Sequence, residues 1–298
     1  MKKQTDSFVL LFLLPILFLA STATAVTFHH PVRRSIAPYL SGDTFRSYCT
    51  HAYDELPFKV IPSAVRHGDT IFVSGDFFDA FCTRIHPQIR NAYILVTHNG
   101  DRAYPGQYRD LLEAPKILAW FTQNPDGTVH EKLHPLPIGL ENRQWNPRNV
   151  EILQRVKMRQ LSKKHLLYCN FSLTSYPVER PGVYALLAHQ PFTYVQERKD
   201  YEAFIEDVAS SKFVLSPRGN GLDTHRLWEA LYVGAIPIVK TSSLDDLYAD
   251  LPVVIVQDWA EVTEAFLEQK YAEISQRSFE GQKLYLDYWV QQLESYKR

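Results

Sequence analysis

The chain has 298 residues, of which 45% are hydrophobic and 22% are charged. Its 32 Lys and Arg residues nearly balance 33 Asp and Glu residues, and the formal net charge is −1. This balance excludes a global field that would attract nucleic acid or anionic lipid, so recognition has to be local. Because the length exceeds the usual size of a single hydrophobic core, we expect two domains.

The first residues predict an export signal. Two lysines near the start precede an apolar run, residues 8–20, and small residues follow as far as Ala25. This pattern is typical of a cleaved signal peptide, which we place at residues 1–25. Because no charge interrupts residues 7–32, an uncleaved membrane anchor is the alternative, and it would add membrane association. Both interpretations place the folded part in the secretory pathway or the cell envelope.

The cysteines Cys49, Cys82 and Cys169 are widely spaced and form no C-x-x-C pair. This spacing argues against a zinc knuckle and allows at most one disulfide, so we expect buried free thiols. No Asp-x-Asp follows a predicted strand, and no His/Cys cluster has the spacing of metal ligands. We therefore predict neither a metal nor another cofactor.

Short apolar runs alternate with longer amphipathic segments along the chain, which is typical of buried parallel strands separated by helices. The pattern predicts an α/β protein with doubly wound sheets. The clearest helical segments are residues 200–209 and 227–233. The predicted strands are residues 70–74, 92–97, 117–121, 166–169, 213–215, 235–239 and 253–256.

A charged, helical stretch at residues 148–164 is our candidate for the junction between two Rossmann-like domains. We accordingly place the N-terminal domain at residues 40–160 and the C-terminal domain at residues 161–298.

The segment F-V-L-S-P-R-G-N-G-L-D-T-H-R-L-W-E-A-L, residues 213–231, runs from a strand through a glycine-bearing turn into a helix. Open α/β sheets bind ligands at such turns. Gly219 and Gly221, on either side of Asn220, permit positive φ and a close approach of the backbone to a ligand. Either Asp223 or Thr224 is expected to cap the helix, whose free N–H groups favour an anion.

Two arginines supply positive charge at this turn. The guanidinium groups of Arg218 and Arg226 match the oxygens of a diphosphate. Glu229 lies on the same helix face as Arg226 and suits the vicinal hydroxyls of a ribose. The alternative is an ordinary Arg226–Glu229 ion pair on a solvated helix. Further candidate donor-binding residues are His225, Asn170 and Arg180.

Residues 212–231, followed by G-A-I-P-I-V at residues 234–239, resemble the carboxyl-terminal half of exostosin-type glycosyltransferases, including bacterial and algal members. Arg226, Glu229 and Ala230 match that family's R-x-x-E-A helix. The resemblance continues to Trp259 and is looser over residues 93–145, where it reaches T-H-N-G-D, W-F-T-Q-N and P-I-G-L. It implies the GT-B architecture, in which two Rossmann-like domains face each other across a cleft. It also implies a nucleotide-sugar donor, with Arg226 at the diphosphate and Glu229 at the ribose.

The looser segments place polar side chains at the carboxyl ends of predicted strands, on a rim that would face the acceptor. Inverting transfer needs a general base there to deprotonate the acceptor hydroxyl. The candidates, in order, are Asp101, His98 and Asp76. The plainer interpretations are a hydrogen-bonded histidine in a turn for His98 and a helix cap for Asp76.

The sequence thus predicts a metal-independent, inverting glycosyltransferase that acts on a glycan, a lipid-linked saccharide or a protein. One alternative is a fucosyltransferase-like GT-B enzyme, and another is a secreted carbohydrate-binding protein without turnover. A hydrolase or phosphatase is disfavoured, because the sequence has neither a G-x-S-x-G elbow nor a phosphate-binding P-loop.

Overall fold

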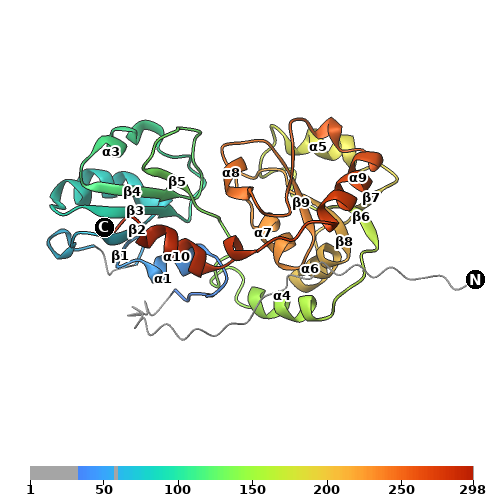
Figure 1. The fold of residues 1–298 in the computed structure, drawn as a ribbon, viewed down its shortest axis with the longest axis horizontal. Coiled ribbons are helices and arrows are strands. Elements are labelled where there is room, and N and C mark those ends of the chain that lie inside the picture. Colours follow the sequence, from blue (N-terminus) through green and yellow to red (C-terminus); the bar gives the residue numbers. More distant parts are fainter. Residues whose placement is uncertain (1–32, 57–59, 298) are drawn as a thin grey trace, which may run out of the picture.

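The computed structural model describes residues 33–56 and 60–297, which form two α/β halves lying side by side (Figure 1). Each half contains a five-stranded sheet whose strands all run parallel. The first sheet has the order β1-β2-β3-β4-β5 and consists of β1 (His51–Tyr53), β2 (Asp69–Ser74), β3 (Tyr93–His98), β4 (Ile117–Thr122) and β5 (Leu133–Pro135). The second has the order β10-β9-β8-β6-β7 and consists of β6 (His165–Cys169), β7 (Thr193–Val195), β8 (Ser211–Leu215), β9 (Ile236–Lys240) and β10 (Val254–Val256).

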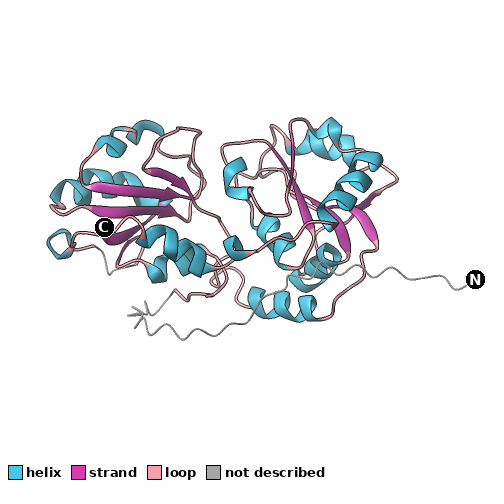
Figure 2. Cartoon of the chain, in the orientation of Figure 1, coloured by secondary structure: helices cyan, strands magenta, loops and turns pink. Residues whose placement is uncertain are grey.

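Helices surround both sheets (Figure 2). The first half carries α1 (Gly42–Tyr48), α2 (Phe78–Ala80) and α3 (Asp110–Glu113). The remaining helices are α4 (Asn149–Met158), α5 (Arg180–Leu187), α6 (Tyr201–Ala209), α7 (His225–Tyr232), α8 (Asp245–Tyr248), α9 (Glu264–Ser275) and α10 (Leu286–Glu294). The predicted α/β architecture, with two separate parallel sheets and helices in two halves of the chain, is confirmed.

Every strand predicted from an apolar run is present within two residues of its expected bounds. The central strands are almost fully buried, and this is why their sequences are apolar without alternation. Strands β1, β5 and β7 were not predicted. Each has three residues, lies at a sheet edge and includes polar residues or proline, whereas the equally short β10 is the apolar run V-I-V and was predicted.

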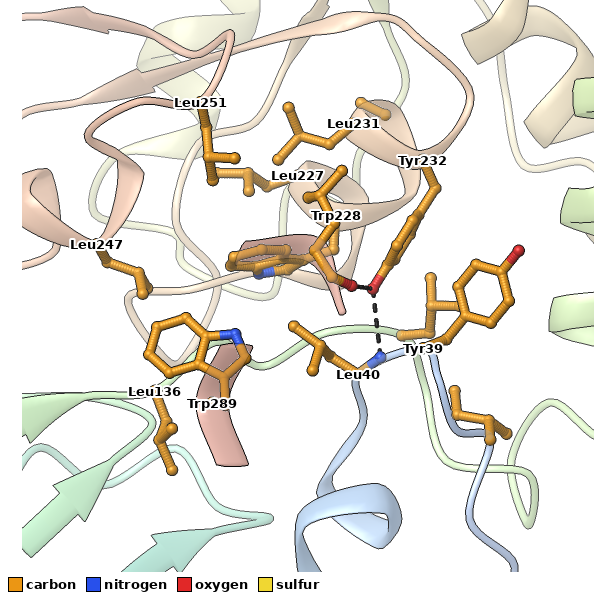
Figure 3. Packing of buried hydrophobic residues seen from close by; sticks show 14 of the residues in the cluster. Tyr39, Leu40, Leu136, Leu227, Trp228, Leu231, Tyr232, Leu247, Leu251 and Trp289 are labelled. Carbon is orange, nitrogen blue, oxygen red and sulfur yellow. Dashed lines mark hydrogen bonds between the residues drawn. The ribbon is translucent and has the colours of Figure 1, made fainter. Parts of the chain in front are cut away.

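A single apolar core extends from the first sheet to the second. Figure 3 shows Leu40 and Trp289 packed against Trp228 and Tyr232 of α7. The Tyr232 hydroxyl lies 3.2 Å from the backbone nitrogen of Leu40, from which it accepts, and donates to the Leu284 carbonyl at 2.6 Å. Since an extensive apolar interface opposes relative domain motion, the two halves are held in a defined relation.

The end of the chain returns to the first half. In Figure 1, α10 lies beside α1 although its colour marks it as the last helix. Tyr48 donates a hydrogen bond to Glu294, and the Tyr296 ring packs on Phe121 and His134. This return was not anticipated from the sequence. The stretch predicted as the junction contains α4, which pairs with α6 through Arg155–Glu202 and Arg159–Glu206 ion pairs.

Cys49, Cys82 and Cys169 are all free; Cys49 and Cys169 are buried as predicted, whereas Cys82 is only partly buried. The predicted signal or anchor at residues 1–25 lies outside the described residues. Among the helices that are described, none combines the length and the apolar character needed to cross a membrane. Export and membrane association therefore stay predictions.

Candidate functional site

Two adjoining depressions lie between the halves. One, of about 410 Å³, surrounds the start of α7 and is called the α7 pocket; its lining includes Arg180, Arg226 and Glu229. The other, of about 550 Å³, lies at the carboxyl ends of β2 and β3 and is called the β3 hollow; its lining includes Asp76 and Trp145. Asp101, Ile138, Glu141 and His225 line both spaces and form their common boundary.

The turn after β8 is fastened to the first half of the molecule. Asn124, which follows β4, accepts hydrogen bonds through Oδ1 from the backbone nitrogens of Leu222 and Asp223 at 3.1 and 3.3 Å. A Cβ on Gly221 would lie 2.9 Å from Asn124 Nδ2, so this glycine is required for contact between the halves. Neither Gly219 nor Gly221 has positive φ, and that part of the sequence prediction was wrong.

Asp223 joins the turn to its surroundings. Its buried carboxylate accepts hydrogen bonds from the Ile138 and Thr224 backbone nitrogens, the Trp228 indole and the Tyr248 hydroxyl, at 2.7–3.2 Å. Burial raises the pKa of Asp223 to about 6, although these four hydrogen bonds oppose the shift. Thr224 is the N-cap residue of α7, but its side chain makes no capping hydrogen bond. The start of α7 therefore opens onto the α7 pocket.

Arg226 and Glu229 both line the α7 pocket. Arg226 Nε is buried without a hydrogen-bond partner among the described residues, and burial lowers the pKa of its guanidinium. Glu229 is only 6% exposed, and burial raises its pKa against the opposing charges of His225 and Arg226. The i,i+3 ion pairs that the described residues form lie elsewhere, at Lys270–Glu273 and Glu294–Lys297. A solvated Arg226–Glu229 pair is therefore not what the structure forms.

Arg180 brings a second positive charge to the α7 pocket. It is 5% exposed and donates hydrogen bonds to the backbone carbonyls of Ser172, Pro217 and Arg218 at 2.8–3.2 Å. Burial, and next the charge of Arg226, lowers the pKa of Arg180 to about 10. The charge of Arg226 therefore disfavours the charged form of Arg180 in the same pocket, and an anion bound there would offset this effect.

Arg218 does not line the α7 pocket with Arg180 and Arg226. Its guanidinium donates to the carbonyls of Gly219 and Asn220 and lies 4.3 Å from the centre of the Tyr176 ring. It lines a separate depression with Lys240. The expectation that Arg218 and Arg226 act together on one ligand is therefore not met, because the turn directs the two side chains to different spaces.

The other predicted donor-side residues line the α7 pocket, namely Asn170, Gly219, Asn220, Gly221 and His225. Asn170 donates from Nδ2 to the Glu197 carbonyl at 2.8 Å. His225 Nδ1 lies 2.8 Å from the Gly139 carbonyl and donates to it. This contact fixes the imidazole tautomer and leaves Nε2 as the acceptor in the neutral ring.

The three predicted bases all line the β3 hollow but differ in their surroundings. His98 is 2% exposed, accepts at Nδ1 from Asn99 N at 2.8 Å and donates from Nε2 to the Pro137 carbonyl at 3.1 Å. Burial lowers the pKa of His98 to about 4, so the ring is neutral and both nitrogens are engaged. Asp76 and Asp101 are exposed, and only Asp101 also borders the α7 pocket.

Sequence reasoning missed two residues of this region, Glu141 and Trp145. Both lie between β5 and α4, directly after the P-I-G-L segment. Glu141 borders both spaces, whereas Trp145 lines the β3 hollow. The segment is irregular in structure, and proximity to P-I-G-L was the only signal that could have indicated them.

Within the described part of the chain, no group of three or more His, Cys, Asp or Glu side chains is arranged to hold a metal ion.

No family model matches the chain, and neither does any curated protein. Solved structures with a similar arrangement include OtsA, at 12% identity over 78% of this chain and 74% of that chain, with a TM-score of 0.39. Another is the catalytic domain of starch synthase IV from Arabidopsis thaliana bound to ADP and acarbose, at 11% identity over 77% and 73%, with a TM-score of 0.33. The GtfA/B complex matches at 10% identity over 78% and 58%, with a TM-score of 0.41. Likenesses this weak carry no functional conclusion.

Proposed function

We propose that the protein is a glycosyltransferase that takes a sugar from a nucleotide-sugar donor and passes it to a saccharide-bearing acceptor with inversion. The observation that supports this most directly is the buried Nε of Arg226, which has no hydrogen-bond partner among the described residues and whose side chain lines a pocket at the start of a helix beside Arg180 and the buried Glu229. A diphosphate neutralises the two cations and the positive end of the helix. The Glu229 carboxylate accepts from ribose hydroxyls.

In this proposal the acceptor occupies the β3 hollow, and transfer takes place at the boundary of the two spaces. Asp101 is the proposed base, because it borders both spaces and is exposed. It takes the proton from the acceptor hydroxyl as that oxygen attacks the anomeric carbon of the sugar. The bond from this carbon to the diphosphate oxygen breaks, and Arg226 and the start of α7 stabilise the departing anion.

His98 and Asp76 are weaker candidates for the base. Both nitrogens of His98 already form hydrogen bonds. Asp76 lines the β3 hollow but not the α7 pocket. Glu141 is the second candidate, because it shares the boundary with Asp101. Since two arginines and a helix terminus supply the positive charge, we propose that transfer proceeds without a metal and persists in EDTA.

A thermal-shift panel of UDP, GDP, ADP and CMP tests the donor assignment on the purified protein. A ligand at about 100 times its Kd stabilises the native state by about 2.7 kcal/mol, equivalent to a rise in Tm of several degrees. We expect at least one diphosphate to raise Tm while its free nucleoside does not. Preference for GDP would favour the fucosyltransferase-like alternative. Failure of every nucleotide would favour a carbohydrate-binding protein.

A further inference from the structure

The charges around the β3 hollow are one-sided. Asp76, Asp101 and Glu141 line it, and none of the three takes part in an ion pair with another described residue. Arg33 also lines the hollow, but it is buried and pairs with Asp43 and Glu55. The hollow therefore presents uncompensated negative charge to any molecule that enters it.

The neutral groups of the hollow complete a polar surface. His98 is neutral because burial lowers its pKa to about 4. The amide side chains of Asn99, Gln123, Asn142 and Gln144 also line the hollow, and hydrogen bonds within the protein hold the first three in place. Carboxylates and amides together are suited to hydroxyl-rich, uncharged molecules, since each hydroxyl both donates and accepts.

Trp145 borders the same hollow and is 73% exposed. The other four tryptophans, Trp120, Trp228, Trp259 and Trp289, are at most 5% exposed. An indole left in water is an apolar surface without a partner, and its flat face suits the apolar C–H face of a sugar ring. Because the ring adjoins carboxylates, a phosphate-bearing nucleotide would be repelled from it, whereas a neutral ring would not.

We propose that the β3 hollow is an acceptor subsite for saccharides that carry no acidic group, either neutral sugars or amino sugars, with Trp145 as the platform for one ring. This inference rests on the proposed function. Acidic glycans are excluded by Asp76, Asp101 and Glu141, so the subsite determines the charge class of the acceptor. The proposed donor binds in the adjoining α7 pocket, where Arg180 and Arg226 supply positive charge.

Acrylamide quenching of tryptophan fluorescence tests this on the full chain, because Trp145 is the accessible indole. The probes are cellotriose, maltotriose, the trimer of glucosamine and trigalacturonic acid, all of equal length. We expect at least one of the first three to protect Trp145 from acrylamide, and trigalacturonic acid to bind at least about tenfold more weakly at low salt. Trp145→Phe should abolish the quenchable signal, and Trp145→Ala should weaken binding measured by calorimetry.

A second variant tests whether the carboxylates of the hollow exclude acidic saccharides. Asp76→Asn should strengthen the binding of trigalacturonic acid several-fold and leave cellotriose binding less affected. The inference is overturned if trigalacturonic acid binds as well as the neutral trimers. It is also overturned if no trisaccharide protects Trp145 while a nucleoside diphosphate still raises Tm, a result that would leave the proposed donor site intact. A protein that binds the neutral trimers but no nucleotide would retain the subsite and lose the proposed transferase function.

Discussion

The α7 pocket and the β3 hollow share a boundary, yet they differ in charge and in construction. The cations of the α7 pocket belong to the second half, and its key residues Arg226 and Glu229 lie one helical turn apart. The acidic residues of the β3 hollow that form no ion pair with a described residue come from three separated places, at Asp76, Asp101 and Glu141. Arg226 and Glu229 of the α7 pocket thus come from one short segment, whereas the carboxylates of the β3 hollow are brought together by the fold.

The opposite charges also suggest how two substrates would be kept apart. An anionic diphosphate is attracted to Arg180 and Arg226 and repelled by the carboxylates of the neighbouring hollow. The boundary residues Asp101, Glu141 and His225 then lie where the two substrates would meet. Substitutions at the boundary, and then on each side of it, would test this division.

The largest effect is expected at the boundary. Asp101→Asn should lower kcat about 10²- to 10⁴-fold, the usual contribution of a general base, without weakening the binding of the nucleotide diphosphate, since the lost charge is negative. Turnover is followed by release of the nucleotide diphosphate in the presence of acceptor.

Asp76→Asn is the matched control for Asp101→Asn, because it removes a carboxylate that lines the β3 hollow but not the α7 pocket. We expect a smaller loss of kcat in this variant. Full activity of Asp101→Asn together with an inactive Glu141→Gln would assign the base to Glu141 instead.

The next effect concerns the two arginines of the turn. Arg226→Ala should raise the Kd of the best nucleotide diphosphate about 10- to 100-fold, because charge-assisted hydrogen bonds to phosphate are lost. Tm without ligand should stay within a few degrees, since the buried Nε has no protein partner to lose.

Arg218→Ala provides the comparison, because this guanidinium lines a different depression. The Kd of this variant for the nucleotide diphosphate should change by no more than about twofold, as expected for a charge outside the pocket. Equal losses in both variants, measured by calorimetry, would contradict the separation of the two side chains.

Acid should lower the free energy of unfolding of the protein through protonation of His98. Its pKa is about 4 in the folded chain against 6.5 for the free side chain, so the unfolded state binds more protons between these values. Stability is therefore complete above pH 6.5 and falls as the pH decreases towards 4, by up to about 3 kcal/mol.

His98→Gln removes this titration, and denaturant unfolding at pH 4 and pH 7 measures it. We expect the variant to lose less stability than the wild type over this interval. Acid loss that remains in the variant belongs to other buried histidines, such as His86, whose pKa burial also lowers to about 4. Identical pH dependence of the two proteins would refute the assignment.

The smallest effect separates the two glycines of the turn. Gly221→Ala should destabilise the protein by about 1–3 kcal/mol, because the new methyl would meet Asn124 of the first half at 2.9 Å. Gly219→Ala should be tolerated, since its methyl would meet only the end of the Arg180 side chain, at 3.4 Å. Comparable melting temperatures of the two variants would show that Gly221 is not needed for the contact.

Much of the fold could be predicted because it depends on local signals. Buried central strands such as β3 and β8 are continuous apolar runs, and parallel strands place the polar residues after them at a common edge. The three-residue strands β1, β5 and β7 could not be found this way, because their sequences H-A-Y, L-H-P and T-Y-V are not apolar runs. The return of α10 to α1 depends on contacts between residues far apart in the chain.

The sequence by itself determined the alternation of strands and helices and the placement of Arg226 and Glu229 on one helix face, since these follow from spacings of a few residues. Only the tertiary structure decided that Arg218 lies in another depression, that Gly221 serves the contact with Asn124, and that His98 is buried and neutral. It also brought Glu141 and Trp145 to the boundary and the hollow. Burial, side-chain direction and charge pairing are set by which distant segments pack together, and spacing along a single chain does not contain that information.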